Sequence, residues 1–409
     1  MDFGNLLSDL FSGVVYLFSM AGVKSLIMFA IAGVLIYLAV KKDYEPTLLL
    51  PIGFGCILAN LPPIIGQVMT ETGTLTEGPV AAVLEHSKGF LDVLFNAGIA
   101  NELFPVLIFI AVGAMIDFSP LLKDPSMIFF GAAAQFGIFI TFLLSLVLIP
   151  MVLGVTDNDM VIKLASAIGI IGAADGPTTL FVANHFQLKD YMGPISVAAY
   201  SYMALVPVIQ PPVIKALTTK KERMIRMDYQ EERCSRSTLI LFPVIVTVVA
   251  GIIVPMSVPL VGSLMFGNLI RECGVLERLS KTAQNELANL VTIVLGITIG
   301  GTMVADKFLQ LDTLLIMGLG LFAFIFDTAG GVLFAKLLNL FRKKKVNPMI
   351  GAAGISAFPM SSRVIAKMAL KDDPSNFILM QSTSANVSGQ LGSIVAGGMV
   401  ISLVSMMIG

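Results

Sequence analysis

Apolar stretches of roughly 20 residues recur along the whole chain, with short polar segments between them. A helix of this length covers the hydrocarbon core of a membrane, so the pattern predicts membrane-spanning helices rather than the short alternating strands of a barrel. The segments are 22–41, 46–62, 99–118, 127–152 and 190–212 in the first half of the chain, and 237–256, 259–272, 288–305, 312–341 and 376–407 in the second. We therefore expect an all-α polytopic membrane protein with about ten transmembrane helices.

Two further apolar segments are interrupted by glycine, proline and polar residues. The first, 161–184, contains GIIGAADGPTT at 169–179, and the second, 348–369, contains GAAGISAFPMSSR at 351–363. Irregular backbone at membrane depth persists only where it is buried in protein or lines a wet cavity. The two segments therefore predict re-entrant helical hairpins whose broken tips form an ion or substrate site.

Positive charge gathers in three places, and these predict the orientation in the membrane. The longest charged stretch is 215–236, and the others are Lys41–Lys42 and Arg342–Lys345. The positive-inside rule places all three in the cytoplasm, and a count with both hairpins re-entrant satisfies all three. Both chain termini and the acidic segments 71–92 and 157–159 then lie outside.

The two halves of the chain resemble each other weakly but in the same order. Gly53-Phe54-Gly55 is echoed by Met265-Phe266-Gly267, 113–117 (GAMID) by 301–306 (GTMVAD), and 174–179 by 356–362. With the predicted orientation the halves run in opposite directions, which is the inverted repeat of elevator-type transporters. The predicted organisation is an amphipathic lead-in at 1–21, a first repeat at 22–214, a cytoplasmic linker at 215–236 and a second repeat at 237–409.

Composition narrows the class of protein. Hydrophobic residues make up 56% of the chain and charged residues 13%, against about 25% charged residues in soluble domains. These proportions indicate an integral membrane protein surrounded by lipid. A net charge of −1 argues against a nucleic-acid partner. Three widely spaced cysteines lack metal-ligand spacing and are interpreted as reduced thiols.

Asp175 is the candidate ion ligand of the first broken segment. A carboxylate at membrane depth costs about 2.5–3.5 kcal/mol and is kept with a cation, a proton or a partner. Thr178 and Thr179 add hydroxyl oxygens, which suit Na⁺ or H⁺ rather than a transition metal. The alternative is a hairpin tip in solvent, where Asp175 simply caps the next helix and Pro177 occupies its first turn.

The second broken segment and its neighbours supply other polar candidates. Arg363 carries a guanidinium that can bind a planar carboxylate through two hydrogen bonds, and the alternative is a snorkelling or structural arginine. Asn386 and Ser388 form a polar core in the last span, or serve small-residue helix packing. Tyr202 lies in mid-span, where a phenol can relay a proton or hold a ligand oxygen. The remaining candidates have plain interpretations: His86 and His185 as surface residues, and Asp327 and Lys336 as structural ones.

The longer motifs resemble those of the β subunits of biotin-dependent, sodium-pumping decarboxylases that act on oxaloacetate, methylmalonyl-CoA or glutaconyl-CoA. The matching stretches are 172–178 (GAADGPT), 198–207 (AAYSYMALVP), 209–212 (IQPP), Asn347-Pro348, 351–363 and 386–389 (NVSG). The resemblance implies a membrane subunit that cleaves carboxybiotin, consumes a proton and exports Na⁺. The alternatives are a Na⁺-coupled carboxylate transporter and a non-catalytic scaffold.

The resemblance also implies roles for individual residues. Asp175 would coordinate Na⁺, with Ser356 and Asn386 contributing to ion sites. Asn347 and Gly351 would shape the cofactor region, Tyr202 would belong to the proton or ion path, and Arg363 would hold the carboxylate of carboxybiotin. Two details depart from the family pattern: Ala173-Ala174 precedes Asp175, and Ser384-Ala385 precedes Asn386.

The implied partners follow from the same resemblance. No lysine lies in a Met-Lys-Met setting, so biotin is expected on a separate carrier subunit. A carboxyltransferase subunit, a small membrane anchor subunit, a homotrimer and a bacterial inner membrane are implied as well. The sequence leaves open which acid or acyl-CoA supplies the CO₂ and how many Na⁺ are moved.

Overall fold

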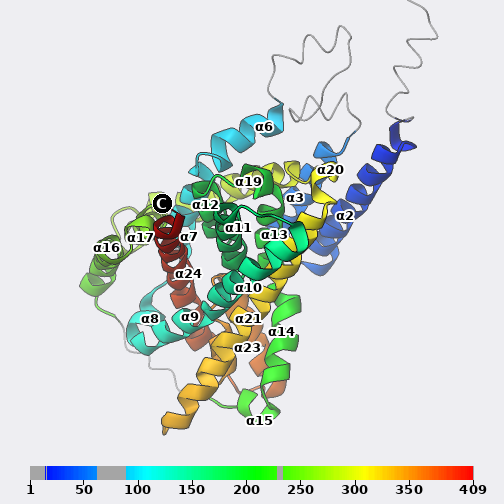
Figure 1. Ribbon diagram of the computed structural model, residues 1–409. Helices are drawn as coiled ribbons and strands as arrows, with labels where there is room; N and C mark the ends of the chain where they lie inside the picture. The colour runs from blue at the N-terminus through cyan, green and yellow to red at the C-terminus, as the bar shows by residue number, and fades with distance from the viewer. Residues whose placement is uncertain (1–13, 15, 62–88, 228–233, 409) are drawn as a thin grey trace, which may run out of the picture.

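The computed structural model describes residues 14, 16–61, 89–227 and 234–408, and every regular element in these ranges is helical (Figure 1). The expectation of an all-α protein is therefore confirmed. Most of the predicted lead-in, the acidic segment before residue 89, and His86 lie outside the described residues.

The first half of the chain contains α2 (Met20–Lys42), α3 (Pro46–Ala59), α6 (Phe90–Leu94), the π-helix η1 (Phe95–Ile99), α7 (Leu103–Met115), α8 (Ser119–Lys123), η2 (Pro125–Met127), α9 (Ile128–Ala134), α10 (Phe136–Leu153), α11 (Asn158–Ile171), α12 (Gly176–His185), η3 (Lys189–Tyr191), α13 (Met192–Ala204) and α14 (Val206–Leu217).

The second half contains α15 (Lys220–Arg223), α16 (Arg236–Ile253), η4 (Pro255–Ser257), α17 (Val258–Glu272), α18 (Glu277–Thr282), the π-helix η5 (Ala283–Leu287), α19 (Ala288–Gly301), α20 (Ala305–Phe308), α21 (Leu311–Phe341), α22 (Met349–Ala352), α23 (Met360–Asp372) and α24 (Leu379–Ile408).

Several helices are long and apolar enough to cross a membrane. In the described residues these are Met20–Lys42, Pro125–Leu153, Arg236–Ile253, Leu311–Phe341 and Leu379–Ile408. The pairs Phe90–Ile99 with Leu103–Met115 and Met192–Ala204 with Val206–Leu217 bend by 60° and 68°, and they raise the number to seven if each is one span. The chain is therefore a polytopic membrane protein, as expected.

The other three predicted spans coincide with shorter helices. These are α3 with 14 residues, α17 with 15 and α19 with 14. At 1.5 Å of rise per residue they extend roughly 21–23 Å, which is less than the thickness of a typical hydrocarbon core. The count of ten spans therefore stays a prediction.

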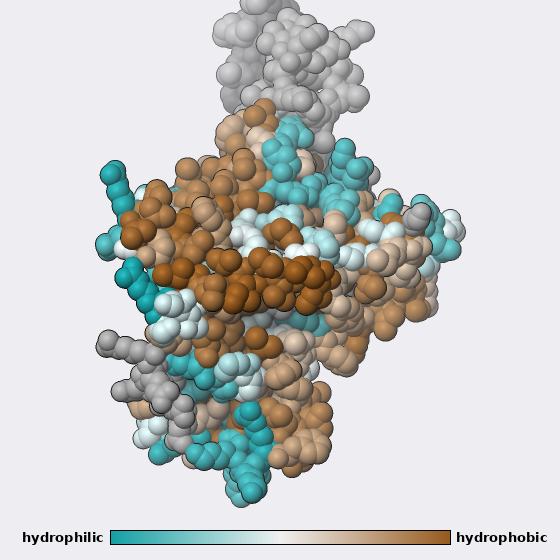
Figure 2. Space-filling view, turned by 90° about the vertical axis from the view of Figure 1, so that its left-hand side faces the viewer, coloured by the Kyte–Doolittle hydropathy of each residue, from teal (hydrophilic) through white to brown (hydrophobic). Residues whose placement is uncertain are grey.

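Apolar residues form a broad band across the face seen in Figure 2, with hydrophilic groups above and below it. Helix α16, at the left of Figure 1, contributes a face of exposed aliphatic side chains: Leu241, Val244, Ile245, Val248, Val249, Ile252 and Ile253. Exposed aliphatic residues over such a length are expected where lipid is the surrounding medium.

Matched contacts join the two halves of the chain. Gly55 of α3 lies so close to α19 that a Cβ there would be 2.3 Å from the Ile297 carbonyl oxygen. Its echo, Gly267 of α17, lies equally close to α7, where a Cβ would be 2.0 Å from the Ile110 carbonyl oxygen. Small residues at both crossings let the helices approach backbone to backbone. Two echoed glycines thus have similar close contacts, and the inverted repeat itself stays a prediction.

The two broken segments have different internal structure. In the first, α11 and α12 flank a non-helical stretch that contains Ala174 at φ +53°. In the second, the arm before the break is the single turn α22, and the long arm is α23. The expectation of two helical arms therefore fits 161–184, whereas 348–369 has one full arm. The first arm of the second segment is short because glycine disfavours a helix, and Gly351 and Gly354 occupy positions that a longer arm would include.

Two of the basic clusters meet at the end of the molecule that carries α15, at the bottom of Figure 1. Arg226, Arg342 and Lys345 line one cavity of about 740 Å³ together with Lys123. The C terminus lies well away from this end, near α17 at the upper left of Figure 1. These two clusters therefore share one end of the molecule, and the orientation given by the positive-inside rule stays a prediction.

Candidate ion site at the two broken helices

Asp175 lies where the first broken segment re-enters a helix. It is the N-cap of α12, and its Oδ1 accepts a hydrogen bond from the Thr178 N–H at 3.2 Å. Pro177, in the first turn, has no N–H to satisfy. The capping interpretation is therefore right locally. The idea of a solvated tip is wrong, because Asp175 is only 3% exposed.

Side chains from two distant segments converge on the other carboxylate oxygen of Asp175. Ser356 Oγ donates to Oδ2 at 2.9 Å from the second broken segment. From α24, Ser393 Oγ donates to the same oxygen at 2.6 Å, and Gln390 Nε2 lies 3.4 Å from it. The backbone also joins the two breaks, since the Ser356 N–H donates to the Ala173 carbonyl at 2.9 Å. The structure thus brings Asp175 and Ser356 together, as the sequence predicts.

Asn386 and Thr178 each present an oxygen that lacks a hydrogen-bond donor. Asn386 Nδ2 donates to the Ile355 carbonyl at 2.7 Å, which fixes the amide against the second break. Asn386 Oδ1 and Thr178 Oγ1 are buried and have no hydrogen-bond partner among the described residues. Buried polar atoms are normally paired, so unpaired oxygens at such a junction suit a small cation as ligand.

The sequence reasoning missed Gln390 and Ser393 as site residues. Counted from Asn386, they follow at positions +4 and +7, so all three share one face of α24. This spacing in the sequence could have indicated that Gln390 and Ser393 lie beside Asn386. Ser388 instead accepts from the Gly131 N–H and donates to backbone carbonyls, so it serves helix packing.

The two tyrosines of α13 occupy different surroundings. Tyr202 Oη donates to the Met317 carbonyl of α21 at 2.5 Å. The Tyr200 ring lies against the tip of the first segment, where a Cβ on Gly176 would come within 2.5 Å of it. Tyr200 Oη is buried and has no hydrogen-bond partner among the described residues. Of the two, Tyr200 is therefore the one in contact with the residue next to Asp175.

The candidates for cofactor binding lie nearer the basic end. Asn347 Nδ2 donates to the carbonyls of Arg223 and Ile225, which ties the linker to the second broken segment. Gly351 packs backbone to backbone on Gly331 of α21. Arg363, in the first turn of α23, is exposed and lies within reach of the charge of Glu45. The structure therefore places Arg363 at the surface and not in a desolvated pocket.

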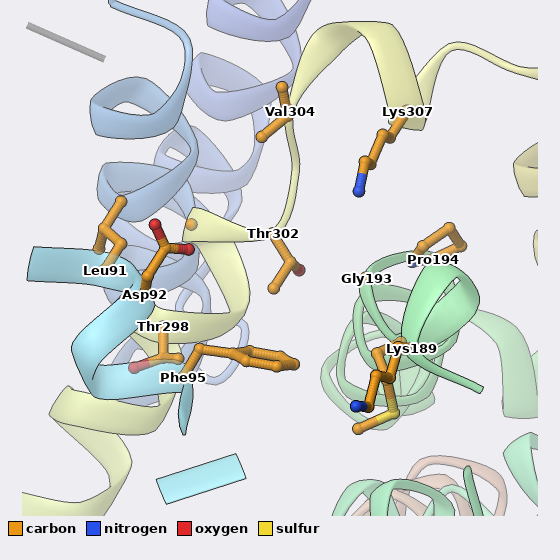
Figure 3. Close-up of a pocket in the computed structure, with 12 residues that line it drawn as sticks. Leu91, Asp92, Phe95, Lys189, Gly193, Pro194, Thr298, Thr302, Val304 and Lys307 are labelled. Carbon is orange, nitrogen blue, oxygen red and sulfur yellow. The ribbon is translucent and has the colours of Figure 1, made fainter. Parts of the chain in front are cut away.

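A separate pocket of about 160 Å³ opens at the other end of the molecule, between α6, α13 and α19 (Figure 3). In Figure 3, Asp92 lies at the left of the pocket, Lys307 reaches in from the upper right, and Lys189 lies at the lower right. Its lining residues include none from α12, α22, α23 or α24. It is therefore a different site from the cluster around Asp175.

An all-helical membrane protein in which two broken helices meet at a buried carboxylate is the class that the fold and the site define. Residues 24–404 match the family described as "Na⁺-transporting oxaloacetate decarboxylase beta subunit", and the chain belongs to that family. The resemblance noted from the motifs is thus confirmed, and the family is one of decarboxylases that transport Na⁺.

Individual relatives agree with this assignment along nearly the whole chain. The methylmalonyl-CoA decarboxylase subunit beta of Propionigenium modestum is 46% identical, over 93% of this chain and 94% of its own length. The probable oxaloacetate decarboxylase beta chain of Vibrio cholerae is 44% identical, over 92% and 95%. The oxaloacetate decarboxylase beta chain of Klebsiella pneumoniae is 43% identical, over 94% and 96%. Each of these relatives is named as the β subunit or β chain of a decarboxylase, and each comes from a bacterium.

Proposed function

We propose that this chain cleaves carboxybiotin brought by a partner subunit and couples the released free energy to Na⁺ export. In the reaction the bond between the biotin ring nitrogen and the carboxyl carbon breaks, and CO₂ leaves. The electron pair stays on the nitrogen, which takes up one proton. The net consumption of a proton gives a chemical step to which ion movement can be coupled.

The observation that carries the proposal is the convergence of Ser356 and Ser393 on a single oxygen of Asp175. Three segments that are far apart in the sequence meet at one buried carboxylate, with the unpaired oxygens of Thr178 and Asn386 in the same segments. Carboxylate, hydroxyl and amide oxygens form a hard ligand set, which suits Na⁺. We assign Na⁺ binding to Asp175, Thr178, Ser356 and Asn386.

Coupling follows from the cost of a buried charge. Without a cation, the Asp175 carboxylate is stabilised only by neutral donors, so it favours taking up either a proton or Na⁺. Exchange of one cation for the other at Asp175 would link Na⁺ export to the proton that the decarboxylation consumes. The α12 N-terminus and the hydroxyl donors hold the carboxylate in place while the cation changes.

Biotin, when carboxylated on its carrier, would supply the CO₂ and the nitrogen that accepts the proton. The exposed guanidinium of Arg363 fits a role in which it receives a carboxylate arriving from the cytoplasm, because two of its N–H groups can bind both oxygens. We assign Asn347 and Gly351 to the shape of this region and Tyr202 to the proton or ion path. The proposal includes a biotin carrier, a carboxyltransferase and a small anchor subunit as partners, a homotrimer, and the inner membrane as location.

The test is carboxybiotin decarboxylation by the purified complex, measured against Na⁺ concentration. Asp175→Asn should abolish Na⁺-dependent turnover, and Asp175→Glu should retain a weakened response. Asp312→Asn, which removes an acid at the start of α21, is the matched control and should behave as wild type. Wild-type Na⁺ activation in Asp175→Asn would remove Asp175 from the ion site.

The alternative function, Na⁺-coupled carboxylate transport, has its own distinguishing result. A symporter would accumulate a carboxylate in proteoliposomes under a Na⁺ gradient without any carrier subunit. We expect no such accumulation by this chain, and its appearance would favour the symporter.

A further inference from the structure

A second carboxylate, Asp327, is buried in the middle of α21, and the proposed ion site does not use it. Its side chain is 0% exposed. Asp327 Oδ1 accepts a hydrogen bond from the Ile138 N–H at 3.1 Å, in the first turn of α10. Helix α10 has no side-chain cap of its own, so Asp327 supplies one from across the helix interface. The interpretation of Asp327 as structural therefore accounts for one of its two oxygens.

The other oxygen, Asp327 Oδ2, is buried and has no hydrogen-bond partner among the residues that the structure describes. It faces the end of α11, where a Cβ on Gly172 would be 2.8 Å from it. On the opposite side, a Cβ on Gly137 would be 2.4 Å from Oδ1. Two glycines thus leave room for a carboxyl group between α10 and the first broken segment. A capping role needs one oxygen only, so the second oxygen calls for a separate explanation.

No cation among the described residues lies at the depth of Asp327 to compensate its charge. Helix α21 packs chiefly against α9, α10, α11, α13, α14 and α22. The ionisable side chains on these helices and on α21 itself are Asp159, Lys163, Tyr200, Tyr202, Lys215, Asp312 and Lys336. Lys336 is nine residues along α21 from Asp327, or about 13 Å, and its ammonium group binds Glu222. An ionised Asp327 would therefore be a buried charge held only by backbone N–H groups at the start of α10, which is costly.

A stripe of unpaired hydroxyl groups begins next to Asp327. Thr141 and Ser145 follow Ile138 at positions +3 and +7, so they lie on the same face of α10 as the residue whose N–H donates to Asp327. Both side chains are fully buried, and neither hydroxyl group has a hydrogen-bond partner within the described part of the chain. The stripe runs for two turns towards the acidic segment at 157–159, which the predicted orientation places outside.

We propose that Asp327 is a second acid within the membrane, that it binds a proton at Oδ2, and that Thr141 and Ser145 connect it towards the outer face. A proton neutralises the carboxylate without further ligands. A Na⁺ ion would need several oxygens around it, whereas Oδ2 faces the Gly172 backbone and the methyl group of Ala323. The inference extends the proposed function, which consumes a proton, but the measurement below does not depend on turnover.

Infrared spectroscopy of the purified complex tests the protonation of Asp327 directly. Asp327→Asn keeps an oxygen that can accept from the Ile138 N–H, so the cap on α10 is retained while the acid is lost. We expect a protonated-carboxyl band that shifts in D₂O, that is retained in Asp175→Asn and that is absent from Asp327→Asn. If Asp327→Asn does not assemble, the band in Asp175→Asn still decides, after isotopic labelling of the aspartate carboxyl groups. Absence of a labelled protonated band in Asp175→Asn would overturn the proposal.

The hydroxyl stripe has its own test and a matched control. Thr141→Val keeps the side-chain shape but removes the hydroxyl group. Ser145→Ala removes the second hydroxyl group of the stripe. Ser166→Ala is the control, because that buried hydroxyl already donates to the Ile162 carbonyl. We expect Thr141→Val and Ser145→Ala to slow hydrogen–deuterium exchange of the Asp327 band roughly tenfold or more, with Ser166→Ala at the wild-type rate. Equal exchange rates in all of these variants would exclude the stripe as the route.

These outcomes separate the inference from the proposed function. Loss of Na⁺ activation in Asp175→Asn together with an unchanged infrared spectrum in Asp327→Asn would support the pump and reject the second acid. The reverse combination would support the second acid and remove Asp175 from the ion site.

Discussion

Ser393 Oγ lies 2.6 Å from Asp175 Oδ2, although 218 residues separate the two in the sequence. The contact brings α24 onto the first broken segment, at the same oxygen that Ser356 reaches from the second. Because Asn386, Gln390 and Ser393 share one face of α24, this helix completes the polar site between the two breaks. A rigid, continuous helix thus positions several of the side chains around the carboxylate.

Ser393→Ala should weaken Na⁺ activation without unfolding the protein. A hydrogen bond to a charged group contributes about 1.5–3 kcal/mol, so its loss should raise the half-activating Na⁺ concentration roughly tenfold or more. The measurement is the rate of carboxybiotin decarboxylation against Na⁺ concentration. Ser402→Ala, on the same helix with its hydroxyl bound to the Gly398 carbonyl, should match wild type. Identical Na⁺ curves for both variants would show that Ser393 does not act on the ion site.

Arg363→Lys should reduce decarboxylation while leaving the complex assembled. Lysine keeps the positive charge but loses the planar fork that binds both oxygens of a carboxylate, so we expect turnover to fall roughly tenfold or more. Lys367→Ala removes an exposed charge one turn further along α23 and serves as the control. Steady-state rates of the purified complexes provide the comparison. Full activity of Arg363→Lys would show that a pair of hydrogen bonds to both carboxylate oxygens is not required.

Labelling of single cysteines should report the orientation in the membrane. After replacement of Cys56, Cys234 and Cys273, a cysteine at Lys344 or Gln230 should resist an impermeant reagent added to intact cells, because the basic clusters are expected inside. Gln230 is outside the described residues. Asn158→Cys, at the exposed first residue of α11, should be labelled in the same experiment. Efficient labelling of the cysteine at position 344 would show that this cluster lies outside, which contradicts the predicted orientation.

The ion pair between Arg226 and Asp373 should stabilise the basic end in a pH-dependent way. The hydrogen bond from Arg226, together with the Ser375 N–H, holds the pKa of Asp373 below its usual value. A lowered pKa in the folded state means that the stabilisation is present above the unfolded pKa of about 3.9 and disappears as the pH falls through the folded pKa.

Thermal unfolding of wild type and Asp373→Asn, followed by circular dichroism, measures this effect. Wild type should be the more stable at neutral pH, and the difference should close in acid below about pH 4. A surface ion pair contributes little, so the shift in the unfolding temperature should be small. Lys281→Gln removes an exposed ion pair with Glu277 and shows how large a shift such a loss causes. A difference that persists unchanged in acid would show that ionisation of Asp373 is not its cause.

Much of this fold is determined locally and could be predicted from the sequence. Long apolar runs predict α2, α10, α16, α21 and α24, because a helix in lipid must satisfy its backbone internally and expose apolar side chains. Gly and Pro within such runs predict the two breaks for the same reason. Asp175 and Ser356 were found because each lies inside a break, where polar groups at membrane depth are conspicuous in the sequence itself.

The partners of these residues were decided by the tertiary structure. Gln390 and Ser393 lie in an unbroken helix, where small polar residues equally suit helix packing, and nothing local shows that they face Asp175. The same holds for Tyr200 against Gly176, and for Asp327, whose position in a span does not reveal which of its oxygens is paired. Hydrophobic periodicity determines which face of a helix is buried. Which residues of another helix lie opposite depends on how segments 181 and 218 residues apart pack together, and only the folded chain decides that.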